Sequence, residues 1–155
     1  INPVDTRSSL ETRALRYLAQ REHSRRELEQ KLAHLTPSTT PEALSTVLDK
    51  LEHDGFLSAE RVVAQVTRMR RARFGSQRII HELKAKGIEE HLIHAAMPAL
   101  QETELDAAVE IWRKKFAKPP ATREERGKQI RFMMGRGFSM EIIQRVLSQA
   151  GEENQ

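Results

Sequence analysis

Side chains that could perform chemistry are few in this sequence. His91 and His94 are three residues apart in a stretch of helical periodicity, and Glu90 precedes His94 by four, so a divalent metal would find two ligands here. No third ligand stands at a supporting spacing, and helical histidine pairs are usually surface residues. We therefore expect no metal site.

Phosphate-binding and acid–base motifs are also lacking. The seven glycines are scattered, mostly where helices are expected to end, and none forms a glycine-rich phosphate loop. Neighbouring carboxylates such as Glu124 and Glu125 diverge on a helix and suit capping and solvation. We expect a protein without cofactor that is not an enzyme.

The composition favours an acidic partner. The 155 residues include 26 Lys or Arg against 22 Asp or Glu, with a net charge of +4, and the sequence pI is about 9.7. There is no cysteine, and no apolar run approaches the ~18 residues that cross a bilayer. We expect a cytoplasmic protein that does not enter membranes.

The basic residues gather between Arg61 and Lys86, where eight Lys or Arg accompany one acid, Glu82. On a helix from Ala59, Arg70 and Arg73 lie one turn apart with no nearby acid to neutralise them. Single arginines suit a solvated face, but the cluster favours a binding face, because unpaired like charges repel one another. Lys114 and Lys115 lie outside this segment and serve as a control for net charge.

Smaller basic groups elsewhere predict a discontinuous positive track. The candidate partner- or DNA-contacting residues are Arg25, Arg26, Arg68, Arg70, Arg71, Arg73, Arg78, Lys84, Lys86, Arg131 and Arg136.

The elements that carry these residues are predicted to be helices throughout. Ser8 with Glu11, Ser24 with Glu27 and Thr122 with Glu125 have the spacing of capping boxes. Leucines and valines recur at intervals of three and four, as at Leu44, Val47, Leu48 and Leu51. No segment shows the alternation of a strand. The spacing predicts nine helices, one of them ending near Pro98.

Landmarks repeat about fifty residues apart. Ser8 and Ser58 each open a group of helices, and Gly87 and Gly137, each followed by an apolar residue, separate the second helix from the third. The fold class is therefore all-α, with three tandem three-helix repeats at 1–57, 58–100 and 101–155. Such units stack into an elongated molecule, whose curvature the sequence leaves open.

Four stretches together resemble the RecX family, regulators of the bacterial RecA recombinase. They are ALRYLAQREHSRRELEQKL (14–32), LEHDGFLS (51–58), the segment from RVVAQV to FGSQRIIHELKAKGI (61–88) and IRFMMGRGFSMEII (130–143). The order, spacing and Gly-apolar turns are similar to the tandem three-helix repeats of that family.

The resemblance implies a non-enzymatic modulator of RecA. It would bind the groove of the RecA filament on single-stranded DNA and restrain strand exchange, ATP hydrolysis and coprotease activity. We expect a monomer, and weak direct DNA binding is left open. The alternatives are a DNA-binding protein of helix-turn-helix type and a helical scaffold for another acidic protein.

Overall fold

The computed structural model describes residues 3–153, with side-chain burial from Ser8 onward. Within that range the chain forms eight helices and no strand, so the all-α prediction is confirmed. The helices are α1 (Pro3–Gln20), α2 (Arg25–Leu35), α3 (Pro41–His53), α4 (Ala59–Arg70), α5 (Ser76–Ala85), α6 (Glu90–Lys115), α7 (Arg123–Gly135) and α8 (Met140–Glu153).

Most predicted caps are confirmed. The Ser24 side chain accepts from the Glu27 amide while the Glu27 carboxylate accepts from the Ser24 amide, which is a complete capping box. Ser58 and Thr122 cap α4 and α7. Gly87 and Gly137 have φ of 78° and 98°, in the left-handed region that glycine enters without strain.

The predicted cap at Ser8 is wrong. Ser8 lies inside α1, where its carbonyl accepts from the Thr12 hydroxyl at 2.9 Å. The helix already includes Pro3, and proline suits the first turn of a helix because its missing N–H has no intrahelical partner there.

The predicted helix end near Pro98 is also wrong. Two of the nine predicted helices form one continuous helix, so the described residues contain eight. α6 runs through Pro98 to Lys115. The carbonyl that lacks an amide partner at Pro98 belongs to His94, which is exposed and so accessible to solvent. From Leu100 to Ala108 the chain contains no glycine or proline to stop the helix.

Three apolar cores lie in succession along the chain. Unit one (α1–α3) buries eight side chains, among them Leu28, Leu48 and Leu51. Unit two (α4, α5 and the first half of α6) buries seven, and unit three (the rest of α6, α7 and α8) buries nine. We keep the boundaries at 57/58 and 100/101 as a proposal, the second falling inside α6.

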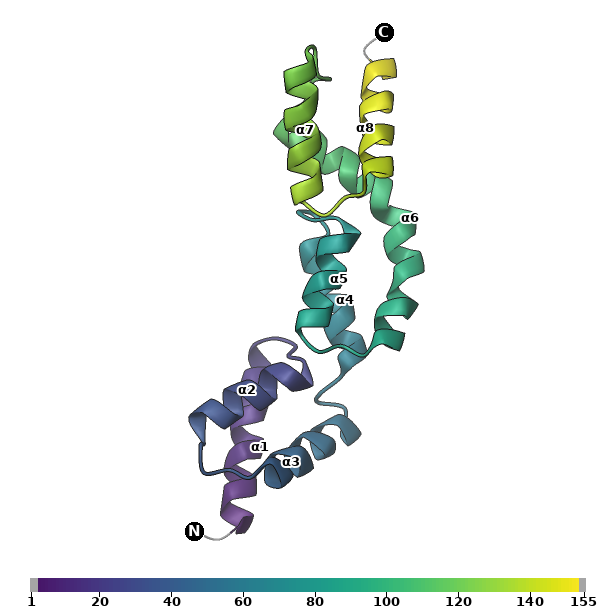
Figure 1. Cartoon of the computed structure of the whole chain (residues 1–155). Helices are drawn as coiled ribbons and strands as arrows, with labels where there is room; N and C mark the ends of the chain where they lie inside the picture. The colour runs from purple at the N-terminus through teal and green to yellow at the C-terminus, as the bar shows by residue number, and fades with distance from the viewer. Residues whose placement is uncertain (1–2, 154–155) are drawn as a thin grey trace.

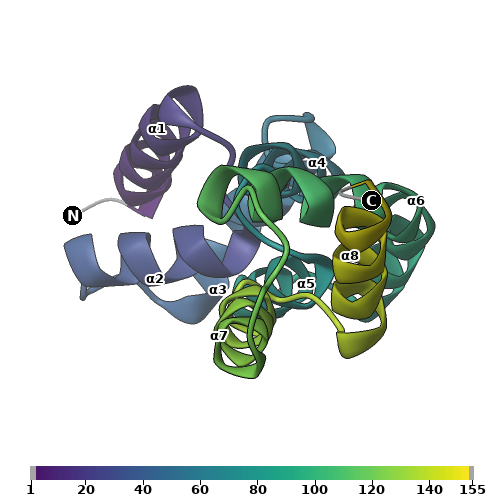
Figure 2. The same cartoon turned by 90° about the horizontal axis from the view of Figure 1, so that it is seen from above.

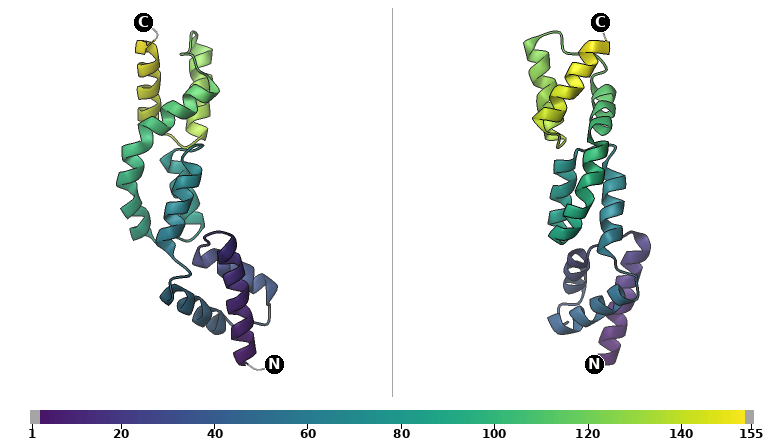
Figure 3. Two further views of the ribbon diagram at one scale, coloured as in Figure 1. Left: turned by 180° about the vertical axis from the view of Figure 1, so that it is seen from behind. Right: turned by 90° about the vertical axis from the view of Figure 1, so that its right-hand side faces the viewer.

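The molecule is elongated, with the two ends of the chain far apart (Figure 1). α6 runs beside units two and three in turn and changes direction between them (Figure 3). Seen along the long axis, α1 and α2 lie to one side of α6 and α8 (Figure 2), so unit one is offset from the rest.

Candidate partner-binding surface

The turn after α4 does not place the arginines as the sequence predicted. α4 ends at Arg70, and Arg73 lies in the following turn, where its amide donates to the Arg70 carbonyl at 3.0 Å. Arg70 and Arg73 are therefore not on one face of a continuous helix.

Two of these arginines also have acidic partners, contrary to the sequence-based expectation. Arg70 pairs with Glu82 at 2.9 Å. Arg71 pairs with Glu104 at 3.0 Å and donates to the Leu100 carbonyl at 2.7 Å. The Arg71 side chain is only 16% exposed. It thus joins the end of α4 to α6 inside the protein, and it offers little to a partner.

Glu104 is the residue that sequence reasoning missed. Its carboxylate accepts from Arg71, from the Ser76 amide at 3.0 Å and from the Ser76 hydroxyl. The available signal was its position: Glu104 continues the buried stripe of Leu100 and Ala108 on α6. A carboxylate on an apolar stripe calls for a buried cationic partner.

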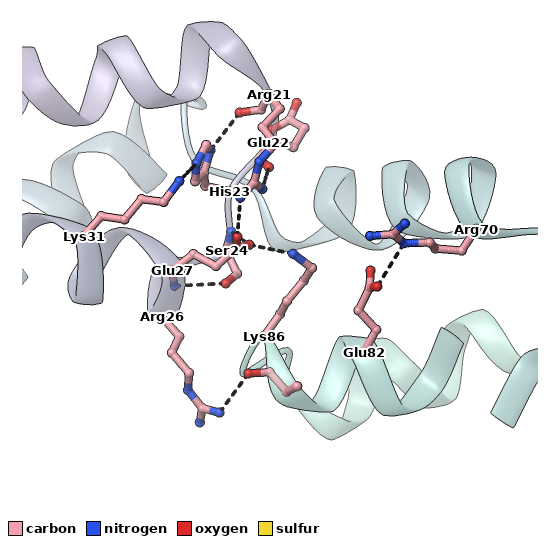
Figure 4. A network of polar contacts seen from close by, with 11 residues as sticks. Arg21, Glu22, His23, Ser24, Arg26, Glu27, Lys31, Arg70, Glu82 and Lys86 are labelled. Atoms are coloured by element: carbon pink, nitrogen blue, oxygen red, sulfur yellow. Dashed lines mark hydrogen bonds and ion pairs between the residues drawn. The ribbon is translucent and has the colours of Figure 1, made fainter. Parts of the chain in front are cut away.

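Arg25, Arg26 and Lys86 also have partners within the protein. Arg25 contacts Asp49 at 2.7 Å and Glu52 at 3.1 Å. Arg26 donates to the Ala85 carbonyl at 3.4 Å, and Lys86 pairs with Glu27 at 3.1 Å. Figure 4 shows these last contacts crossing between α2 and the end of α5. Arg26 and Lys86 therefore connect unit one to unit two.

Glu27 lies at the centre of that connection. Burial raises the pKa of its carboxyl, but hydrogen bonds from Arg21, from the Ser24 amide and from Lys86 outweigh burial and lower the pKa to about 2. The carboxylate therefore stays charged at neutral pH.

His23, next to this network, is fully buried. Its Nδ1 lies 3.0 Å from the Arg21 carbonyl, and its Nε2 lies 2.8 Å from the Lys31 ammonium (Figure 4). Burial lowers the pKa of the imidazole, and the charges of Arg21 and Lys31 lower it further. A neutral ring that donates from Nδ1 and accepts at Nε2 satisfies both neighbours.

Three of the candidate residues converge on one aromatic ring. The guanidinium carbons of Arg78, Arg136 and Arg73 lie 4.3, 5.5 and 5.6 Å from the centre of the Phe74 ring. Arg78 donates to the Gly135 carbonyl at 2.9 Å, and Arg136 reaches the Arg73 carbonyl at 3.5 Å. Charges more than fifty residues apart in sequence thus share one surface, at the junction of units two and three.

This convergence depends on a close approach of two turns. The Gly75 amide donates to the Arg136 carbonyl at 2.7 Å, and the Gln77 amide donates to the Gly137 carbonyl at 3.2 Å. A Cβ at Gly75 would lie 2.5 Å from the Gly137 oxygen. Only glycine at residue 75 allows the turns to meet.

A cleft of about 220 Å³ opens beside this cluster. It is lined by Ala72, Arg73, Ile111, Lys114, Lys115, Phe132 and Arg136. Lys114 and Lys115 therefore lie in the same cleft as Arg73 and Arg136. They cannot serve as the independent charge control that their position in the sequence suggested.

The remaining candidates, Arg68, Lys84 and Arg131, are exposed and make no ion pair within residues 3–153. They do not line the cleft. Of the candidate residues, Arg73, Arg78 and Arg136 thus form one concentrated basic surface, whereas Arg68, Lys84 and Arg131 are isolated charges.

The histidine pair on α6 is exposed, and His91 contacts Glu89 at 3.2 Å. Among the described residues no three side chains of the metal-binding types come together. In the same part of the chain, every helix is too short or too polar to span a membrane.

The fold and its surface define a class: an all-helical protein of tandem three-helix units with a concentrated basic surface. Family comparisons refine this. The model described as the second three-helix domain of RecX matches residues 60–97, and the model of the third such domain matches residues 102–147. The chain belongs to the RecX family.

Full-length relatives agree with this assignment. A protein of Leptothrix cholodnii named regulatory protein RecX is 47% identical over 146 residues, which cover 94% of this chain and 92% of the relative. A protein of the same name from Ralstonia pickettii is 40% identical, covering 93% of this chain and 89% of its own length. The crystal structure of RecX from Lactobacillus salivarius superposes with a TM-score of 0.81 at 20% identity, over 96% of this chain and 99% of that one.

Proposed function

We propose that this protein regulates the RecA recombinase. It binds the RecA filament on single-stranded DNA in the groove and restrains strand exchange, ATP hydrolysis and coprotease activity. Membership of a family of regulatory proteins supports the general role. The observation that carries the binding mode is the gathering of Arg73, Arg78 and Arg136 on one surface, because a basic surface of this kind suits an acidic partner.

The elongated shape supports contact with more than one subunit of a filament. Three units in succession each make a modest contact, and linked contacts gain affinity through effective concentration. The protein itself acts by binding in this proposal, and any ATP hydrolysis belongs to RecA.

The test compares two ligands for the same protein at physiological salt: naked single-stranded DNA and a RecA filament assembled on that DNA. We expect tighter binding to the filament, together with a lower rate of ATP hydrolysis by RecA. Equal affinity for both ligands would instead favour the helix-turn-helix alternative, in which DNA is the direct partner.

Charge reversal localises the contact. Arg73→Glu with Arg78→Glu changes two exposed residues of this surface, and we expect filament binding to weaken by roughly tenfold or more, because attraction becomes repulsion. The matched control is Arg123→Glu with Arg126→Glu, two exposed residues in the first turns of α7. Equal losses in the two double variants would show that net charge, and not this surface, governs binding.

A further inference from the structure

We propose that the cleft between the α4–α5 turn, α6 and α7 is a docking site for an acidic protein segment that also presents an apolar side chain. The inference rests on the proposed function only for the source of that segment, since a RecA filament would supply it.

The charge of the cleft is uniform. Four of its seven lining residues are cations (Arg73, Lys114, Lys115 and Arg136), and none is an acid. None of these four makes an ion pair within the described residues, whereas Arg25, Arg70, Arg71 and Lys86 all do. Four clustered positive charges repel one another, and carboxylates entering the cleft relieve that repulsion.

The rest of the lining is apolar. Ile111 is 7% exposed, and with Ala72 and the half-buried Phe132 it completes the lining. A peptide matches this combination, because an Asp or Glu can meet the cations while a neighbouring apolar residue packs on the exposed Ala72, next to Ile111. Phosphate groups would leave the apolar part of the lining in contact with water.

The aromatic rings near the cleft already contact cations and one another. Arg136 lies 5.0 Å and Lys115 5.2 Å from the centre of the Phe132 ring, and Phe116 packs against the same ring edge-on at 5.4 Å. Phe74 is covered by three guanidinium groups. Binding of single-stranded nucleic acid commonly uses open aromatic faces and a continuous basic groove, and this surface offers neither.

The cleft is organised before a ligand arrives. Arg136 contacts the Arg73 carbonyl, and the backbones of residues 75 and 136 are hydrogen-bonded at 2.7 Å. α6 contributes Ile111, Lys114 and Lys115 from a single continuous helix. Little ordering is therefore required on binding, which favours affinity for a short segment.

The experiment uses three fluorescein-labelled probes with the full-length protein. The first is a ten-residue peptide of alternating acidic residues and Leu or Phe, the second is a peptide with Ser in place of each Leu or Phe, and the third is a thymidine oligonucleotide of matching charge. Fluorescence anisotropy measures affinity. We expect affinity to decrease from the acidic-apolar peptide to the acidic peptide and then to the oligonucleotide. We also expect the NMR chemical shifts of the Ile111 methyl groups to change when the first probe is added.

Two double variants locate the site. Lys114→Gln with Lys115→Gln removes two exposed charges from the cleft. We expect this double variant to bind the first probe roughly tenfold more weakly. Arg123→Gln with Arg126→Gln is the matched control, and we expect it to change binding less than about twofold, since exposed charges at a distance are screened. Circular dichroism checks that both variants keep their helices.

Three results would overturn the inference: no binding of the first probe, equal losses in the two variants, or tighter binding of the oligonucleotide with the same dependence on Lys114 and Lys115. A protein that binds the peptide but leaves RecA unaffected would refute the proposed function and leave the cleft intact. If the protein still inhibits RecA but does not bind the peptide, the docking site is refuted and the proposed function stands.

Discussion

His23 illustrates how one buried side chain makes the stability of a unit depend on pH. It lies between the Arg21 carbonyl and the Lys31 ammonium. Burial and the Lys31 charge lower the pKa of the ring, and together with the charge of Arg21 they outweigh the hydrogen bond to the Arg21 carbonyl, which raises it. A proton added to Nε2 would bring a second positive charge to within 2.8 Å of Lys31. The folded protein therefore resists protonation of this residue more than the unfolded chain does.

We predict that acidification from pH 7.5 to pH 5 lowers the free energy of unfolding, through His23. Its pKa is lowered from 6.5 in the folded state, so the unfolded state binds more protons below that pH, and stability falls as the pH falls. The loss is about 1.4 kcal/mol for each pH unit spanned between the two pKa values. Urea denaturation followed by circular dichroism measures it.

The control is His23→Gln, in which the difference between pH 7.5 and pH 5 should shrink. Glu27 does not interfere in this window. Its pKa is lowered from 4.5 to about 2, so its contribution is complete above pH 4.5 and is lost only as the pH falls towards 2. A pH dependence that is unchanged in the variant would assign the effect to other groups.

At the scale of elements, the packing of α5 against the turn between α7 and α8 depends on a glycine. Gly75 has an ordinary backbone conformation, because its φ is −80°. Its importance comes from space: a Cβ there would meet the Gly137 carbonyl carbon at 2.7 Å as well as its oxygen. The backbone of a turn cannot move aside as a flexible side chain can.

We predict that Gly75→Ala destabilises the protein by about 1–3 kcal/mol, because the turns must separate and the Gly75–Arg136 hydrogen bond lengthens. Denaturant midpoints measure the change. Gly135→Ala is the control: that glycine is helical, has open space around the Cβ position, and should give equal or greater stability on substitution. An unaltered midpoint for Gly75→Ala would mean that units two and three are not packed through these turns.

At the scale of the whole molecule, the two junctions between units differ in kind. Units two and three share α6 and the buried pair Arg71–Glu104. Units one and two share no apolar cluster among the described residues, and the side-chain contacts between them are polar: Arg61 with Glu22, Lys86 with Glu27, and Arg26 with the Ala85 carbonyl. The Arg61–Glu22 pair is partly exposed, and exposed ion pairs stabilise little and are screened by salt. The Lys86–Glu27 pair is more buried, with side chains 20% and 16% exposed. Because no apolar cluster joins units one and two, we expect the first junction to be the more flexible one.

We predict that Arg26→Ala with Lys86→Ala broadens the range of orientations of unit one. The chain has no cysteine, so spin labels at Ser38→Cys and Gln149→Cys report the distance between units one and three. The width of this distance distribution should increase in the double variant. It should also increase in 0.5 M salt, where the Debye length falls to roughly 4 Å and the ion pairs between the units are screened. Labels at His81→Cys and Gln149→Cys, within units two and three, are the control and should show an unaltered width.

If the width between units one and three stays the same in the double variant, Arg61 and the linker through Gly55 fix unit one without the other contacts. The Arg61 side chain donates to the Gly55 carbonyl at 2.7 Å as well as pairing with Glu22. The same comparison made with Arg61→Ala then separates the two possibilities.

The sequence by itself determined the helical fold and most helix ends. Capping at Ser24, Ser58 and Thr122 and the left-handed turns at Gly87 and Gly137 depend on residues within a few positions of one another. Such features can be predicted from short stretches of sequence, because the interacting residues are close together along the chain. The same holds for the apolar stripes, whose spacing follows from the helical period.

Only the tertiary structure decided which charges are free. Arg70 meets Glu82 twelve residues away, Arg71 meets Glu104 thirty-three residues away, and Lys86 meets Glu27 across fifty-nine. Local sequence carries no signal for such pairs, since each depends on how whole helices pack. The same packing brought Lys114 and Lys115 to Arg73 and formed the cleft. Helix formation is governed by neighbours along the chain, whereas a binding surface is governed by neighbours in space.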